Sequence, residues 1–596
     1  MRTLTELITG ELKEAFKACG YADDHIIAVL SNRPELCEYQ CNGAMPLAKQ
    51  EHCSPLEIAE HAAEKLSGSR LISQAQAVKP GFLNLKISEA FLAQYLCEMA
   101  ADEKMGAQEA AGGERKKIVM DYGGPNVAKP LHVGHLRSAV IGESIKRILR
   151  YAGHDVISDV HLGDWGLQMG LIITELKERR PFLVYFDPDY TGDYPEEAPF
   201  TVSELEEIYP TASARSKEDS AYKERALEAT AQLQAGRRGY AALLNHILNV
   251  SVTDLKKNYE KLNVSFDLWY GESDAQKYVP DMIQGFIDGG YAYESEGALV
   301  VDIAEDTDKK ELPPCIVRKS DGASLYATTD LATLVQRERD FHPDMVLYVV
   351  DKRQELHFTQ VFRTAKKTGI VPQETQLVFK GFGTMNGKDG KPFKTRAGGV
   401  MRLETLMDEI NAEMLKKIEE NYTEHGKEAP DPEEARSTAA IVGLSALKFG
   451  DLSNQASKDY VFDIDRFTSF EGKTGPYILY TVVRIKSILN KYREMVSGTL
   501  PQTITETGNP AAKSLMLEMI KWNTVTDEAA QETAPHKVCS FLYDLSNAFN
   551  HFYHETPVLT EEDPRMRDSY VALLALALRE LETGIDLLGF SAPEKM

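Results

Sequence analysis

Short apolar runs and helical stretches alternate through the middle of the chain. Runs that indicate buried strands lie at Ile118–Met120, Val156–Val160, Ala298–Ile303, Met345–Val350 and Gln376–Phe379. Segments with the periodicity of amphipathic helices separate them. This alternation predicts a mostly parallel sheet wrapped by helices.

The pattern changes on both sides of this region. Towards the N-terminus, helical patterns accompany one strand signal at Gly81–Ile87, and the small, polar segment Lys104–Lys117 is typical of a linker. Beyond about Met401 the strand signals end, and two long helical blocks, Thr438–Met495 and Ala511–Leu588, predict an all-helical domain.

Within the middle region, an acidic and then strongly helical segment predicts an insertion. We therefore expect an N-terminal α/β domain, a central α/β domain with this insertion, a connecting helical segment and a C-terminal helical domain. These cover residues 1–110, 111–400 with the insertion at about 181–269, 401–437 and 438–596.

Composition changes this picture little. In 596 residues, no apolar run approaches the roughly 20 residues needed to span a bilayer. The N-terminus lacks the basic and apolar regions of a signal peptide, so we expect a cytoplasmic protein, in which the seven scattered cysteines are reduced thiols. The net charge of −24 argues mildly against a nucleic-acid partner, but net charge does not describe local basic patches.

The most informative stretch follows the first strand of the predicted sheet. After Met120 come a Gly-Gly-Pro-Asn turn and a helix that begins at a His-Val-Gly-His tetrad, residues 132–135. A helix N-terminus beyond the carboxyl end of a strand offers free N–H groups and a positive dipole end to phosphates. His132 and His135 share one helical turn, and their N–H groups can stabilise charge that develops on phosphorus. Gly134 leaves room for a flat nucleotide ring.

Other interpretations of the paired histidines remain open at this point. The pair could bind a metal or lie at the surface by chance, although no further ligand in a known zinc motif accompanies it. A second candidate zinc set has a spacing that matches no common zinc finger, and core thiols are the more usual explanation: Cys37, Cys41, His52 and Cys53. We expect no metal site.

Several longer stretches narrow the interpretation. GPNVAK precedes the tetrad, and further stretches follow it: HLGDWGLQMG at His161–Gly170, SLYATTDLA at Ser324–Ala332, GKDGKPFKTRAGG at Gly387–Gly399, FEGKTGPYILY at Phe470–Tyr480 and the final LLGFSAPEKM. Together they resemble the arginine-specific branch of the class I aminoacyl-tRNA synthetases, whose HIGH signature matches the tetrad. The resemblance runs from about residue 80 to the last residue, in family order. It implies a Rossmann-like catalytic domain, an N-terminal domain that contacts the outer corner of tRNA, and a C-terminal helical bundle that binds the anticodon.

The resemblance also implies the reaction. Mg-ATP and L-arginine form arginyl-adenylate with release of pyrophosphate, and arginine then passes to the 2′-hydroxyl of the terminal adenosine of tRNA(Arg), with release of AMP. No prosthetic group is implied, and we expect a monomer. Enzymes of this branch generally need bound tRNA for the first step. The implied ATP-binding residues are His132, Gly134, His135, Gly163, Asp164 and Gly383.

The sequence departs from the class I pattern in one place. Class I enzymes carry a Lys-Met-Ser-Lys-Ser loop whose second lysine stabilises the phosphates, but Thr395 stands at that position here. Many arginine-specific enzymes instead use a lysine just before the HIGH tetrad, which here is Lys129. A Gly-rich basic loop is expected to close over pyrophosphate. The implied catalytic residues are His132, His135, Lys129, Lys394 and Arg396.

A selective pocket for arginine needs carboxylates, because the guanidinium is planar, always charged and carries five donors. Tyr326 and Asp330 are four residues apart and share a helical face, while Asp121 ends the first strand. The resemblance implies that Asp330, Tyr326 and Asp121 hold the guanidinium. It implies a second set for the α-amino and carboxylate groups: Asn126, Gln354 and His135.

In the helical region, Tyr477, Tyr480 and Arg484 fall on one helix face, which is usually a core pattern. The resemblance and the mixture of basic and aromatic side chains favour contacts with the anticodon loop, joined by the C-terminal Met596. Two rival functions remain. A sister synthetase for cysteine or glutamate would need zinc ligands or arginines in its pocket, and a non-catalytic tRNA-binding paralogue would not need the catalytic residues present here.

Overall fold

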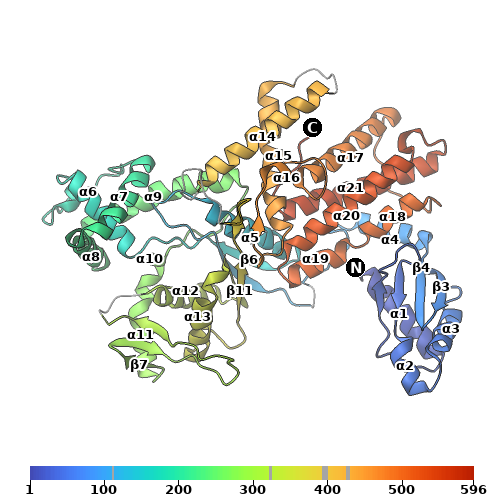
Figure 1. The fold of residues 1–596 in the computed structure, drawn as a ribbon, viewed down its shortest axis with the longest axis horizontal. Helices are drawn as coiled ribbons and strands as arrows, with labels where there is room; N and C mark the ends of the chain where they lie inside the picture. Colours follow the sequence, from blue (N-terminus) through green and yellow to red (C-terminus); the bar gives the residue numbers. More distant parts are fainter. Residues whose placement is uncertain (111–112, 321–324, 392–400, 425–429) are drawn as a thin grey trace. The chain divides into compact units, whose positions relative to one another are not determined.

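The computed structural model describes residues 1–110, 113–320, 325–391, 401–424 and 430–596. They form two units, which we call terminal and central (Figure 1). The terminal unit combines Met1–Gly113, Asn421–Phe449 and Thr468–Met596. The central unit combines Glu114–Glu420 and Gly450–Phe467. No helix in these described ranges has the length and apolar character needed to cross a membrane.

The central unit is built on a four-stranded parallel sheet. Its spatial order is β11 (Gln376–Phe382), β10 (Met345–Asp351), β5 (Lys117–Tyr122) and β6 (Asp155–Asp159). The central strands β5 and β10 are almost wholly buried, which explains their continuous apolar sequence. The sequence prediction of these four strands is confirmed.

The strand order of this sheet reverses between β5 and β10. Helix α5 (Val133–Tyr151) connects β5 to β6 on one side, and the later strands β10 and β11 lie on the other side. Ligands of such sheets bind beyond the carboxyl ends of the strands at the point of reversal. The turn that carries the His-Val-Gly-His tetrad follows β5 at this point.

A separate three-stranded antiparallel sheet contains the run predicted at Ala298–Ile303. Its strands are β7 (Ala292–Ser295), β8 (Ala298–Val301) and β9 (Cys315–Arg318). The expectation that this run joins the parallel sheet was therefore wrong. Glu296 and Gly297 both have positive φ, 52° and 79°, which makes a two-residue hairpin turn between β7 and β8.

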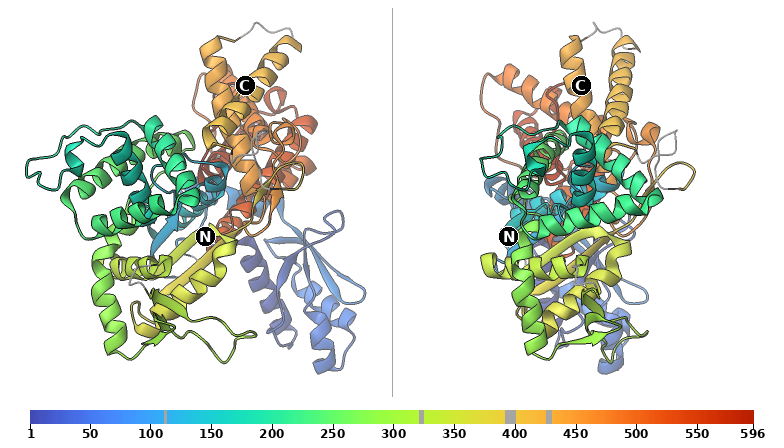
Figure 2. Two further views of the ribbon diagram at one scale, coloured as in Figure 1. Left: turned by 60° about the vertical axis from the view of Figure 1, so that its left-hand side comes forward. Right: turned by 90° about the vertical axis from the view of Figure 1, so that its left-hand side faces the viewer.

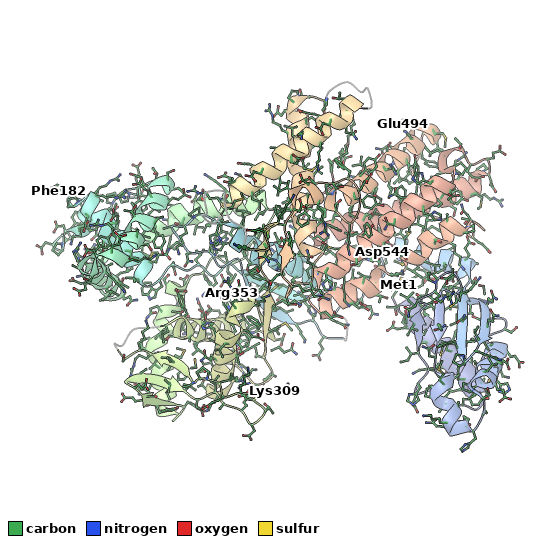
Figure 3. All side chains as sticks on the ribbon, viewed as in Figure 1. Met1, Phe182, Lys309, Arg353, Glu494 and Asp544 are labelled. Atoms are coloured by element: carbon green, nitrogen blue, oxygen red, sulfur yellow. The ribbon has the colours of Figure 1, made fainter. Side chains whose placement is uncertain are left out.

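The predicted insertion is helical. Helices α7 (Val202–Glu218), α8 (Ser220–Gln234) and α9 (Arg238–Lys261) gather in one cluster, teal to green in Figure 2. An apolar core joins α7 and α8 to α6 (Leu167–Arg179): Leu171, Ala212, Tyr222 and Ala226. Phe182, labelled at the outer edge of the insertion in Figure 3, is 98% exposed.

The terminal unit begins with a small α/β domain. Its antiparallel sheet has the order β1 (Ala28–Leu30), β2 (Tyr39–Cys41), β4 (Phe82–Ile87) and β3 (Ile72–Val78). Strand β4 confirms the strand predicted at Gly81–Ile87. The other helices of this domain are α1 (Leu4–Ala18), α2 (Ala44–Glu51), α3 (Pro55–Lys65) and α4 (Glu89–Ala101). Cys37 and Cys41 are buried, and every cysteine is a free thiol.

The rest of the terminal unit is helical, as the sequence predicts. Its helices include α15 (Pro432–Leu452), α17 (Gly475–Val496), α18 (Pro510–Met519), α19 (Trp522–Gln531), α20 (Pro535–Glu555) and α21 (Pro564–Leu587), and α14 (Leu403–Glu424) precedes them. The N-terminal domain is attached to them within one unit, since Arg579 donates to the carbonyl of Ala100 at 2.6 Å and Trp522 donates to that of Lys104 at 3.3 Å.

Residues 450–467 interrupt the helical region and belong to the central unit. Strand β13 (Tyr460–Val461) pairs in parallel with β12 (Met385–Asn386), so the expectation that strands end near Met401 was wrong here. Asp451 forms a buried ion pair with Arg137 of α5, with 3.1 Å between Oδ2 and Nε. The sequence placed this segment in the helical domain because its partners are distant in the chain, with a separation of 314 residues for this pair.

Candidate active site

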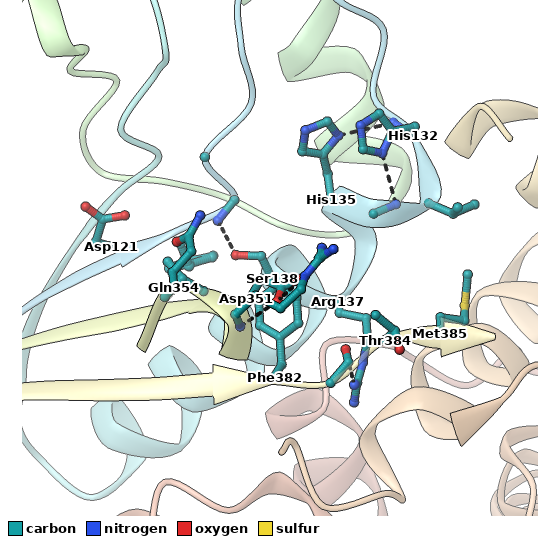
Figure 4. A pocket seen from close by; sticks show the side chains of 18 residues that line it. Asp121, His132, His135, Arg137, Ser138, Asp351, Gln354, Phe382, Thr384 and Met385 are labelled. Atoms are coloured by element: carbon teal, nitrogen blue, oxygen red, sulfur yellow. Dashed lines mark hydrogen bonds and ion pairs between the residues drawn. The ribbon is translucent and has the colours of Figure 1, made fainter. Parts of the chain in front are cut away.

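A cavity of about 460 Å³ lies at the reversal point of the parallel sheet (Figure 4). Its walls come from the ends of β5, β10 and β11 and from the start of α5. The residues predicted to bind substrates that line it are Asp121, His132, Gly134, His135, Gln354 and Gly383. The tetrad thus lies where the parallel topology places a ligand.

The two tetrad histidines form the N-terminal cap of α5. Nδ1 of His132 accepts the backbone N–H of Gly134 at 3.0 Å, and Nδ1 of His135 accepts the backbone N–H of His132 at 3.2 Å. A neutral imidazole that accepts at Nδ1 carries its proton at Nε2. Both rings therefore keep an Nε2–H donor for a ligand in the cavity.

Burial favours the neutral form of both histidines. Burial, with help from the charges of His132 and Lys129, lowers the pKa of His135 to about 3. Burial also lowers the pKa of His132, and Lys129 adds to this effect. The ring centroids lie 3.9 Å apart. A Cβ on Gly134 would lie 2.7 Å from Cε1 of His132, so glycine allows this close arrangement.

Arg137 links the wall of this cavity at Gly383 to the segment 450–467. It is 2% exposed, and besides its ion pair with Asp451 it donates to the carbonyl of Gly383 at 2.7 Å (Figure 4). A Cβ on Gly383 would lie 2.5 Å from Oδ1 of Asp459, so the segment 450–467 packs directly on this glycine. Arg137 and Asp451 were not predicted from the sequence, and neither has a local signal that distinguishes it.

A larger cavity of about 930 Å³ lies between the sheet and the insertion; we call it the insertion cavity. Asn126, Lys129 and Tyr326 line it, and Tyr326 is 74% exposed. Glu272 and Trp165 line it as well. The residues predicted to bind arginine are therefore divided, since Asn126 and Tyr326 face this cavity while others face the cavity at the strand ends.

Asp121 has a cationic partner within the protein. Arg337 of α12 (Tyr326–Phe341) lies with Nη2 2.6 Å from the Asp121 carboxylate and 3.1 Å from that of Asp159, all three buried. The role predicted for Asp121 in holding the guanidinium of the substrate remains a prediction. A signal for Arg337 existed, because it follows Asp330 by two helical turns and shares its face.

Asp330 lies in the second turn of α12. Nε2 of His357, on α13 (Glu355–Thr368), lies 2.5 Å from its Oδ2. Glu272 is a second, unpredicted carboxylate in this area. Burial raises the pKa of Glu272 to about 7, and the carboxylates of Asp330 and Asp164 contribute to the increase while His161 opposes it. Two carboxylates thus lie near enough to each other for their charges to interact.

Gly163 and Asp164, which were predicted to bind ATP, line neither of these two cavities. A Cβ on Gly163 would lie 2.5 Å from Oδ1 of Asn126. Asp164 is 1% exposed and accepts the backbone N–H and the hydroxyl of Ser273 at 2.9 and 2.5 Å. Both residues therefore contact the chain next to Asn126 and Glu272, and their predicted contact with ATP remains a prediction.

The predicted basic loop is only partly described. Thr395, Lys394 and Arg396 lie outside the described residues. Lys388, at the start of this loop, pairs with Asp463 and Asp465, each at 3.1 Å.

Three of the residues predicted to contact the anticodon loop, Tyr477, Tyr480 and Arg484, lie on one face of α17. Tyr480, 41% exposed, has the Arg484 guanidinium 4.6 Å from its ring centre, and Arg484 also lies 5.4 Å from the ring of Tyr553. The hydroxyl of Tyr477 contacts Asn547 and Asn550 of α20. Glu594, near Met596, pairs with Lys486 of α17 at 3.0 Å. Tyr553 of α20, which was not predicted from the sequence, lies next to Arg484.

A parallel sheet with a neutral histidine pair at a helix N-terminus, placed at the reversal point, defines a nucleotide-binding catalytic domain of the class I aminoacyl-tRNA synthetase type. Three family descriptions match the chain: "Arginyl tRNA synthetase N terminal domain" over residues 2–87, "tRNA synthetases class I (R), catalytic domain" over 98–464 and "DALR anticodon binding domain" over 478–596. The chain belongs to the arginyl-tRNA synthetase family.

Relatives and solved structures agree with this assignment. The chain is 61% identical to the arginine--tRNA ligase of Agathobacter rectalis, with 100% of both chains covered, and 52% identical to that of Alkaliphilus oremlandii, also with full coverage. The arginyl-tRNA synthetase structures from Plasmodium falciparum and Thermus thermophilus are each 23% identical to it. Their TM-scores are 0.81 and 0.77, with 100% and 99% of this chain and 100% of each of theirs covered, which supports the same fold.

Proposed function

We propose that this chain attaches L-arginine to tRNA(Arg) through arginyl-adenylate, with Mg-ATP as the second substrate, and that it works as a cytoplasmic monomer. The neutral histidine pair at the start of α5 is the observation that carries the first step. Its two Nε2–H donors and the helix dipole can stabilise the charge that forms at the α-phosphate while pyrophosphate leaves. Lys129 lies three residues before His132, and its positive charge acts at both histidines of the tetrad.

Selection of arginine rests on the carboxylates near the insertion cavity. Asp330 and Glu272 can accept a guanidinium that carries five donors, and Tyr326 offers a flat partner. Asn126 and Gln354 bind the α-amino and carboxylate groups. A lysine substrate would leave buried acceptors without donors, because its ammonium cannot reach two carboxylates in the planar geometry of a guanidinium.

Pyrophosphate exchange with each amino acid, measured with and without tRNA, tests this proposal. We expect arginine to be the one amino acid that supports exchange, and we expect this exchange only when tRNA is bound. Exchange driven by cysteine or glutamate would favour a sister synthetase, and no exchange with any amino acid would favour a non-catalytic tRNA-binding protein. Exchange with arginine in enzyme freed of tRNA by nuclease would contradict the requirement for tRNA.

The pKa of Glu272 predicts how arginine binding depends on pH. A carboxyl group with a pKa of about 7 is half protonated near neutrality and must lose its proton to pair with a guanidinium. The arginine KM should therefore fall as the pH rises from roughly 6 to 8. In Glu272→Gln this dependence should disappear and the KM should stay high. A pH profile of the variant parallel to that of the wild type would remove Glu272 from the pocket.

The exposed aromatic surface of α17 and α20 predicts a separate effect on tRNA. Tyr480→Ala should lower kcat/KM for tRNA by roughly 5-fold to 150-fold, since loss of one base-stacking partner costs about 1–3 kcal/mol. Removing Glu594–Met596 should have the same direction of effect, and the two changes should be partly non-additive if they hold the same loop. Tyr293→Ala, a 51% exposed tyrosine of the central unit, is the matched control. Wild-type tRNA kinetics in both altered proteins would show that this surface does not contact tRNA.

A further inference from the structure

The ammonium of Lys129 rests on the aromatic ring of Tyr209, a residue of the insertion. The distance from Nζ to the ring centre is 4.6 Å. Within the described part of the chain, Lys129 forms no ion pair with a carboxylate. Both side chains line the insertion cavity. Lys129 precedes the tetrad by only three positions, yet its ammonium contacts a residue of the insertion.

The ring that carries Lys129 is itself fixed. Helix α7 begins with a capping box between Thr201 and Glu204, and Tyr209 packs against the core that joins α7 to α6 and α8. Residues of the insertion and of α6 also hold the backbone next to Lys129. Ser251 of α9 accepts the backbone N–H of Ala128 at 3.0 Å, and Gln168 donates to the carbonyl of Val127 at 2.5 Å.

The same face of α7 also contacts residues 401–403, a distant segment that pairs with the backbone at the start of the tetrad. Glu206, one helical turn before Tyr209, pairs with Arg402 at 3.1 Å. Residues 401–403 in turn bond to 131–133, since Val133 donates to the carbonyl of Met401 at 3.1 Å and Leu403 donates to that of Leu131 at 3.0 Å. One helix therefore contacts both segments that flank His132.

An aromatic ring is suited to hold a lysine that must act on a phosphate. A carboxylate would fix the ammonium equally well, but it would neutralise the charge that the transition state needs. A ring attracts the ammonium through its quadrupole and leaves the full positive charge in place. It also reduces the rotameric freedom of a long side chain, which would otherwise have to be lost during the reaction.

We propose that Tyr209 is a positioning residue for adenylate formation, which acts by holding Lys129 in place through its ring. This inference rests on the proposed role of Lys129 at the phosphates. It gives the insertion a part in the first chemical step, through a contact that depends on the ring and not on the phenolic hydroxyl. The single-turnover rate of arginyl-adenylate formation, with tRNA bound, measures this contact directly.

We expect Tyr209→Leu to slow this rate by about tenfold, which corresponds to one cation–π contact of ordinary strength. The arginine KM should be unchanged. Tyr209→Phe keeps the ring and should react within about twofold of the wild type. Tyr194→Leu is the matched control, because Tyr194 is a half-buried tyrosine of the same insertion with the Arg238 guanidinium 5.8 Å from its ring centre. It should not change the rate.

The double variant Lys129→Ala/Tyr209→Leu separates positioning from general damage to the fold. If Tyr209 acts through Lys129, the double variant should react at the rate of Lys129→Ala alone. A further tenfold loss in the double variant, a Tyr209→Phe rate as low as that of Tyr209→Leu, or a wild-type rate in Tyr209→Leu would each overturn the inference. A wild-type rate in Lys129→Ala alone would instead contradict the proposed role of Lys129.

Discussion

Replacing Lys129 with alanine is expected to slow arginyl-adenylate formation by about 100-fold or more, the usual effect of removing one group that stabilises transition-state charge. The expectation follows from the sequence, in which Thr395 stands where class I enzymes have their second loop lysine. It is supported by the position of Lys129: burial is the main cause of the lowered pKa of His132 and His135, and the charge of Lys129 adds to it at both. Single-turnover measurement of adenylate formation, with tRNA bound, tests it.

The control for this variant is Lys256→Ala. Lys256 lies on the insertion helix α9 and, like Lys129, places its ammonium over an aromatic ring, that of Trp269 at 5.1 Å. It lines neither of the two cavities described above, so its loss should leave the rate of adenylate formation unchanged. The affinity for tRNA should change little in Lys129→Ala. An activation rate equal to that of the wild type would mean that another cation serves the phosphates.

Asp330→Asn is expected to lower kcat/KM for arginine by about 30-fold to 1000-fold while leaving the KM for ATP nearly unchanged. A charge-assisted pair between a carboxylate and a guanidinium contributes about 2–4 kcal/mol when it is shielded from water. Asparagine keeps the size of the side chain and can still bond to His357, so the substitution removes mainly the charge. Pyrophosphate exchange at varied arginine and ATP concentrations, with tRNA bound, separates the two effects.

Two comparisons make this test specific. Asp288→Asn changes a carboxylate near the end of α11 (Val279–Asp288), where its partner is Gln284, and should leave both substrates unaffected. Glu272→Gln should resemble Asp330→Asn in direction, because both carboxylates act on one guanidinium in our proposal. If Asp330→Asn keeps wild-type arginine kinetics, the guanidinium is bound elsewhere and the paired-carboxylate pocket is wrong.

The sequence predicted the order of strands and helices around the tetrad. Apolar runs identified β5, β6, β10 and β11. The central strands β5 and β10 are almost wholly buried, and strands buried on both faces need apolar residues at nearly every position. The start of α5 followed from the turn residues and the tetrad, since a helix N-terminus is defined by short-range hydrogen bonds. The hairpin of β7 and β8 was misassigned, although Glu296–Gly297 carries a local turn signal, because an apolar run alone does not reveal its partner strand.

The chain by itself therefore determined the class of fold, the helical nature of the insertion and the C-terminal region, and the place of the tetrad at the end of a strand. These features depend on periodicity, capping and turn preferences within a few residues. Only the tertiary structure decided that Asp121 pairs with Arg337, that Asp451 and residues 450–467 support Gly383, and that Tyr209 holds Lys129. Each of these contacts joins residues far apart in the chain, and the energy of an ion pair or ring contact depends on burial and distance, which the local sequence does not specify.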